Sequence, residues 1–99
     1  MGAITIGDCC LIGDQVAVCD CDWHEIDPSH RNRSAGPIRP VAISNNVWLG
    51  SRVMVLKGVT IGDNSVVAAA RVVTKSIPAN CVVAGNPAKY IRTIEQKIP

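Results

Sequence analysis

The chain has 99 residues, a formal net charge of +2, 47% apolar residues and a slightly positive mean hydropathy. It is too short for two independent cores, too apolar for a disordered chain and too weakly basic for a dedicated nucleic-acid binder. No apolar run approaches the roughly 18 residues of a membrane span, and the first residues lack the pattern of a secretory signal. We therefore expect one domain over residues 1–99, located in the cytoplasm, without nucleic-acid or membrane partners.

Aliphatic residues recur every six positions near the start of the chain and again from residue 43. They are Ile6, Ile12, Val18, Ile43, Leu49, Val55, Ile61, Val67 and Val73. A helix rotates by about 600° over six residues and would scatter these side chains around its axis. A flat strand would not need turn residues every six positions, yet Gly and Asx residues recur at that spacing. The pattern predicts three-sided coils of short strands that stack in parallel, with the aliphatic side chains pointing inward.

Two further columns of the repeat keep the same period. The residue directly after each aliphatic position is mostly small, as at Gly50 and Gly62. The residue four positions after each aliphatic position is mostly apolar, as at Val47 and Val53. Arg71 breaks the second column, where a charged side chain is not stably buried without a partner.

The repeat is interrupted once, because the interval between Val18 and Ile43 is not a multiple of six. The segment at about 23–40 is polar, rich in proline and contains both histidines, His24 and His30. Such an excursion from a regular coil is a loop, and loops on rigid scaffolds often carry function. A tolerated surface insertion is the alternative.

The C-terminal stretch at about 86–99 changes character again, after a turn signal at Gly85-Asn86-Pro87. Residues 88–97 are compatible with a last strand and a short helix. Together these would form a cap over the end of the stack, whose unpaired backbone groups would otherwise promote aggregation.

The five cysteines do not form the pattern of a disulfide framework. Cys9 and Cys10 are adjacent, and a single residue separates Cys19 from Cys21, so neither pair has suitable disulfide geometry. We therefore expect reduced thiols, as in a cytoplasm, and no metal cofactor. A zinc site formed by Cys19, Cys21 and His24 is an alternative, although the four-ligand spacing of structural zinc sites is absent.

Several motifs together resemble the hexapeptide-repeat acyltransferases, in particular the galactoside and maltose O-acetyltransferases and the polysaccharide-modifying sugar acetyltransferases. The motifs are DCDWH at 20–24, NNVWLG at 45–50, GVTIGDNSVV at 58–67, VVTKSIPAN at 72–80 and GNPAK at 85–89. The resemblance covers residues 4–94. It implies an all-β fold, a left-handed parallel β-helix of about five coils.

The resemblance also implies a reaction, the transfer of an acetyl group from acetyl-CoA to a hydroxyl of a sugar or similar small molecule, performed by a homotrimer with sites between subunits. The catalytic histidine of the family precedes the strand that leads into NNVW, and His24 stands at the matching distance before Val41. A neutral imidazole can accept the proton of the attacking hydroxyl. Asp22, Glu25 and Asp27 are the acids that could orient it.

The contacts to coenzyme A are implied in the same way. Trp48 and Ser51 would line the thioester end, with a backbone N–H near Ser51 facing the developing oxyanion. The other implied contacts are Ala69, Thr74 and Lys75 along the groove, and Lys89 and Arg92 at the phosphate and adenine end. Arg71 stands where the family has small residues, and would turn outward, meet a phosphate of coenzyme A or obstruct the groove.

Two other functions remain open. Chains of the family are nearly twice as long and carry further coils that hold the acceptor, so this sequence could form a non-catalytic scaffold or partner subunit without them. A trimeric metalloenzyme of the gamma carbonic anhydrase type would use His24 and His30. The coenzyme A motifs favour the transferase.

Overall fold

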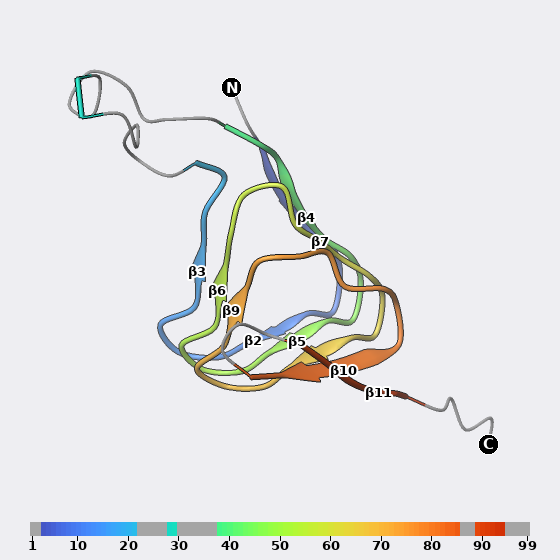
Figure 1. The fold of residues 1–99 in the computed structure, drawn as a ribbon. Helices are drawn as coiled ribbons and strands as arrows, with labels where there is room; N and C mark the ends of the chain where they lie inside the picture. Colours follow the sequence, from blue (N-terminus) through green and yellow to red (C-terminus); the bar gives the residue numbers. More distant parts are fainter. Residues whose placement is uncertain (1–2, 22–27, 30–37, 86–88, 95–99) are drawn as a thin grey trace.

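A computed structural model describes residues 3–21, 28–29, 38–85 and 89–94, and its strands wind into a coil of triangular cross-section (Figure 1). The strands are β1 (Ile4–Ile6), β2 (Leu11–Ile12), β3 (Ala17–Val18), β4 (Val41–Ile43), β5 (Trp48–Leu49), β6 (Met54–Val55), β7 (Thr60–Ile61), β8 (Val66–Val67), β9 (Val72–Val73), β10 (Cys81–Ala84) and β11 (Lys89–Thr93). This confirms the all-β class. No helix long and apolar enough to cross a membrane occurs in the described part of the chain.

Each of the first three turns of the coil contributes one strand to each of three sheets, and the last turn adds β10 to the second. The first sheet has the order β1-β4-β7, the second β11-β10-β8-β5-β2, and the third β3-β6-β9. In the middle of the stack, Trp48 pairs in parallel with Val66, which lies three of the predicted six-residue units further along the chain. One turn therefore takes three of these units, and the structure is the predicted parallel β-helix.

The core is a narrow column of branched aliphatic side chains. The six-residue series from Ile43 to Val73 is at most 2% exposed, and the second apolar column is buried beside it. Ser65 is also buried, and its hydroxyl donates to Pro78 O at 2.7 Å while accepting from Cys81 N at 3.2 Å. Ile6 and Ile12 are 44% and 46% exposed, because no described strand stacks on the outer side of β1 and β2.

The small residues that follow the aliphatic positions have a direct steric reason. A Cβ at Gly62 would lie 2.7 Å from Cα of Ala79, and a Cβ at Gly50 would lie 2.7 Å from the backbone nitrogen of Ala69. Backbone atoms of the next turn of the coil therefore occupy the space where a side chain would begin.

The corner between the first and second sheets, here called the first corner, is held by an amide ladder. Asn46, Asn64 and Asn80 adopt the left-handed conformation, with φ of 57°, 64° and 61°, which asparagine tolerates better than most residues. The side chain of Asn46 donates to Asn64 Oδ1 at 2.9 Å, and that of Asn64 donates to Asn80 Oδ1 at 2.8 Å. The predicted Asx turns thus also join successive turns of the coil.

The predicted loop leaves after β3 and returns at β4. Thr5 pairs with Ala42 across the loop, whereas Ala42 pairs with Thr60 in the regular coil, so the turn that carries the loop is about twice as long in sequence. An antiparallel bridge between Cys21 and Ile38 closes the base of the loop, and Arg39 N donates to Asp20 O at 2.8 Å. The loop is therefore anchored at the corner between the third and first sheets, here called the third corner.

The C-terminal end of the second sheet carries an antiparallel strand. β11 pairs with β10, with Arg92 opposite Val82, which confirms the predicted last strand. The short helix predicted after it falls mainly on residues 95–99, outside the described residues. The parallel edge of β10 is therefore covered by a strand of opposite direction.

Extending the amide ladder should stabilise the fold. Cys9 has φ of 60° and occupies the turn position equivalent to Asn46, whose N–H donates to Asp8 O at 2.8 Å. Cys9→Asn should raise the free energy of unfolding by about 1 kcal/mol, because asparagine suits this conformation and adds a hydrogen bond. Urea denaturation measures the change, with Cys9→Ser as the control of similar size. Equal stability of the two variants would contradict the ladder as the cause.

Candidate functional site

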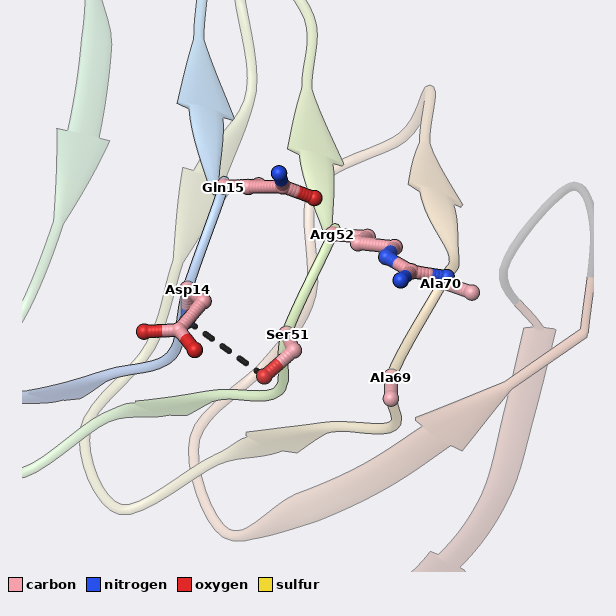
Figure 2. A pocket seen from close by; sticks show the side chains of 6 residues that line it. All are labelled: Asp14, Gln15, Ser51, Arg52, Ala69 and Ala70. Carbon is pink, nitrogen blue, oxygen red and sulfur yellow. Dashed lines mark hydrogen bonds between the residues drawn. The ribbon is translucent and has the colours of Figure 1, made fainter.

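The corner between the second and third sheets, here called the second corner, forms an open hollow. Three pairs of turn residues stack there, and together they line a pocket of about 610 Å³ (Figure 2). The pairs are Asp14 with Gln15, Ser51 with Arg52, and Ala69 with Ala70. We call this hollow the corner pocket.

A second, more apolar pocket of about 440 Å³ adjoins the corner pocket on the second sheet. It is lined by Gly13, Trp48, Gly50, Ser51, Val66, Val67, Ala68 and Ala69. Ser51 and Ala69 belong to both pockets, so the two hollows meet there. We call the second hollow the apolar pocket; the indole of Trp48, 53% exposed, forms part of its wall.

The hollow exists because the second corner lacks a complete polar ladder. At the first corner, Asp8 N donates to Asn45 Oδ1 and Asn45 N to Asp63 Oδ1, both at 2.8 Å. At the second corner, Asp14 N donates to Ser51 Oγ at 3.3 Å, but Ala69 has no side-chain acceptor for the next rung. The ladder therefore ends at the backbone N–H of Ser51. The methyl side chains of Ala69 and Ala70, on the next turn of the coil, are too short to fill the space beside it.

Three of the predicted coenzyme A contacts come together here, since Trp48, Ser51 and Ala69 all line the apolar pocket. Thr74 and Lys75 are exposed in the turn after β9, at the third corner, and line neither pocket. Lys89 and Arg92 belong to β11, at the edge of the second sheet. Within one chain, the predicted contacts are thus spread over two corners and one sheet edge.

The predicted base, His24, lies outside the described residues. The same holds for the candidate acids Asp22, Glu25 and Asp27, and for His30. The loop that carries them is anchored at the third corner, whereas the corner pocket lies at the second corner and the apolar pocket beside it on the second sheet.

The sequence prediction missed Asp14, Gln15, Arg52 and Ala70 as lining residues. Their spacing in the sequence contained a usable signal. The intervals from Gln15 to Arg52 and from Arg52 to Ala70 equal the intervals between paired residues of β3, β6 and β9. Equal turn positions on successive coils must lie at the same corner.

The cysteines of the described strands and turns are free thiols. Burial raises the pKa of Cys19, and the neighbouring Cys21 and Asp20 raise it further because a nearby negative charge disfavours a thiolate. A neutral buried thiol is a poor nucleophile and a poor metal ligand. No group of three or more metal-ligating side chains occurs among the residues described, and His24 is outside them.

The side chain of Arg71 is half-buried. Its carbonyl accepts from Met54 N at 2.8 Å, which fixes the turn of the coil to which it belongs. Its Nε is buried and has no hydrogen-bond partner in the described structure. Which of the three expected arrangements Arg71 adopts stays a prediction, with the Nε atom buried.

Comparison with known proteins agrees with this architecture. Residues 40–70 match the family described as bacterial transferase hexapeptide (six repeats). The chain is 44% identical over 94 residues to the galactoside O-acetyltransferase of Escherichia coli, a match that covers 95% of this chain and 46% of that enzyme.

Three solved structures are similar. A galactoside acetyltransferase in complex with coenzyme A shares 44% identity with a TM-score of 0.86, over 93% of this chain and 46% of that one. A Vibrio cholerae hexapeptide-repeat acetyltransferase complexed with acetyl coenzyme A shares 38% with a TM-score of 0.85, over 94% and 50%. A maltose O-acetyltransferase from Clostridium difficile shares 30% with a TM-score of 0.70, over 94% and 67%.

The chain belongs to the hexapeptide-repeat acyltransferase family, as the sequence motifs predicted. The predicted left-handed parallel β-helix is confirmed with it. The chain spans less than half the length of the first curated relatives it matches.

The buried Nε–H of Arg71, which has no hydrogen-bond partner in the described structure, should lower the free energy of unfolding. Arg71→Lys replaces that N–H by a methylene group and keeps the positive charge, so it should raise the free energy of unfolding by about 1 kcal/mol. Thermal or urea denaturation measures the difference. Arg71→Val, which continues the column of Val53, should stabilise as well. A loss of stability in both variants would show that the N–H is hydrogen-bonded in solution.

Proposed function

We propose that the protein is an acetyl-CoA-dependent O-acetyltransferase that acts on a hydroxyl of a sugar or similar small molecule. The observation that carries the proposal is the convergence of Trp48, Ser51 and Ala69 on one apolar pocket beside an interrupted polar ladder. The relatives support the choice of cofactor, because two of the solved structures hold coenzyme A or its acetyl form.

The apolar pocket suits the acyl end of the cofactor. Trp48 and Val66 offer apolar surface, while the turns at Gly50–Ser51 and Ala68–Ala69 offer backbone groups to the amides of a pantetheine arm. Lys75, Lys89 and Arg92 are the cations we assign to the phosphate and adenine end, since phosphates bind best to charged donors.

The backbone N–H of Ser51 is the donor we assign to the oxyanion. A thioester carbonyl under attack develops negative charge on its oxygen, and a preorganised N–H stabilises that charge. The ladder of side-chain acceptors ends at this N–H because the next rung is Ala69. A donor without a rung above it is available to a ligand in the hollow.

His24 is the proposed general base. Its neutral imidazole takes the proton of the acceptor hydroxyl as the hydroxyl oxygen bonds to the thioester carbon. The tetrahedral intermediate then collapses, the C–S bond breaks, and the imidazolium returns the proton to the departing thiolate of coenzyme A. One of Asp22, Glu25 and Asp27 would fix the imidazole orientation.

The separation of the predicted residues supports a homotrimer. Thr74, Lys75 and the base of the His24 loop lie at the third corner, whereas Ser51 and Ala69 lie at the second. A single site that uses both sets requires two neighbouring copies of the chain, with the second corner of one facing the third corner of the next.

An exposed apolar stripe on the second sheet also suits such contact. Leu11, Trp48, Val66 and Val82 are successive register partners on this sheet, and Leu11 and Trp48 are 65% and 53% exposed. Large exposed side chains in a row are typical of an interface.

Free thiols throughout the described strands and turns agree with a reducing compartment, so we place the trimer in the cytoplasm.

The second candidate is a non-catalytic β-helix that serves as a scaffold or partner subunit. The observation that favours it is the partly buried Arg71, whose position differs from the small residues of the family. A scaffold would bind neither acetyl-CoA nor an acceptor.

Calorimetric titration with acetyl-CoA distinguishes the two functions. We expect saturable binding near one site per subunit, and we expect Lys75→Ala and Arg92→Ala each to weaken it about tenfold, because each removes a charge-assisted contact to phosphate. Titration at several protein concentrations, combined with sedimentation, tests the trimer. A folded trimer that does not bind acetyl-CoA would favour the scaffold.

Replacement of the base should separate binding from chemistry. His24→Gln should lower kcat for acetyl transfer by about 10²- to 10⁴-fold, because general base catalysis contributes that much, and should leave acetyl-CoA affinity within about twofold. Thiol release from acetyl-CoA in the presence of a galactoside measures the rate. Unchanged turnover in the variant would remove His24 from the mechanism.

A further inference from the structure

Arg71 carries a half-buried charge that no described acid neutralises. Its Nε is buried without a hydrogen-bond partner, and no hydrogen bond or ion pair joins its side chain to another described residue. The equivalent position on the preceding turn of the coil is Val53, which is fully buried. A charged group that replaces a simple apolar one in this way is costly unless an anion binds to it.

The position of Arg71 leaves it open to a ligand on the C-terminal side of the coil. It directly precedes β9, the end strand of the third sheet, so no described strand stacks beyond it. Its terminal Nη atoms are not among the buried atoms without a partner, and they therefore reach solvent. Ala69, two residues earlier, lines both pockets. Arg71 thus follows the turn at which the pockets meet.

The C-terminal end of the second corner is basic. Ala68 N donates to Val83 O at 3.0 Å, so Ala84 lies one turn of the coil beyond Ala68. Lys89 pairs with Ala84 in the antiparallel hairpin. Among the described acids, Asp14 is the one at this corner, and it belongs to the first turn (Figure 2). An anion at the C-terminal end would meet basic residues and no described acid.

The length of coenzyme A brings its diphosphate to this end. By standard covalent dimensions, the extended arm between the sulfur and the diphosphate spans about 16 Å. The second sheet has the order β5-β8-β10-β11 beyond Ser51, and its three strand spacings of about 4.8 Å total about 14 Å. A thioester at Ser51, with the arm running past Ala69, therefore places the diphosphate near the start of β11.

We propose that Arg71 binds the diphosphate of coenzyme A through a bidentate contact from its Nε–H and one Nη–H. The inference rests on the proposed function, which places the thioester at Ser51. A guanidinium presents these two N–H groups side by side, in the geometry that two phosphate oxygens accept. Binding would give the buried Nε–H its missing acceptor. Lys75, Lys89 and Arg92 then serve the 3′-phosphate and the adenine.

The test compares three ligands by calorimetric titration of the whole chain. Acetyl-CoA carries the diphosphate and the 3′-phosphate, 3′-dephospho-acetyl-CoA carries the diphosphate, and S-acetylpantetheine carries neither. Arg71→Val should weaken the first two by the same factor, about tenfold, and leave the third within about twofold. Arg71→Lys keeps the charge without the paired donors, so it should lose less affinity than Arg71→Val.

Stability does not confound the comparison, because both variants are expected to be more stable than the natural protein. The equal factor for the first two ligands also separates direct contact from long-range attraction, which would favour the more highly charged acetyl-CoA. A loss confined to acetyl-CoA would assign Arg71 to the 3′-phosphate and overturn the proposal. Unchanged affinity, tighter binding in Arg71→Val, or an equal loss for S-acetylpantetheine would overturn it as well.

A titration with inorganic diphosphate, followed by NMR, separates this proposal from the proposed function. Failure of the natural protein to bind acetyl-CoA would overturn the acetyltransferase. Diphosphate binding that weakens in Arg71→Val would still support the anion site in that case. If neither acetyl-CoA nor diphosphate binds, both proposals are wrong.

Discussion

The packing of each inward aliphatic side chain on its equivalent in the next turn of the coil is the interaction on which the rest of the structure depends. Ile43 lies beside Ile61, and Leu49 beside Val67, and all four are almost fully buried. This contact fixes the length of a turn, because a shift by a single position would place polar side chains in the core. The same spacing brings the backbone of the next turn of the coil close to Gly50 and Gly62.

A fixed turn length places equivalent turn residues at the same corner, so each corner becomes a column with its own chemistry. Asparagines at the first corner join successive turns through their side chains. Alanines at the second corner interrupt the polar ladder above Ser51 and open the two pockets. The function of this scaffold therefore depends on a few turn residues, while the strands supply rigidity and position.

The loop illustrates how an insertion is tolerated without loss of register. Its additional residues leave and return at one corner, where the Cys21–Ile38 bridge closes the base. β4 then resumes on β1 with the register of the regular coil. Residues that the family motifs associate with one site are found at different corners of one chain, which makes association of copies part of the proposed chemistry.

The sequence by itself determined the parallel coil, its three-sided turn and the inward columns, because the period of six allows few other arrangements of Val and Ile. The family motifs identified Trp48, Ser51 and Ala69, which do converge. Only the tertiary structure showed that Thr74 and Lys75 lie at another corner, that the Arg71 Nε is buried, and that Arg52 and Asp14 share a pocket. These features depend on which turns stack and where each side chain points, and a local repeat does not specify that.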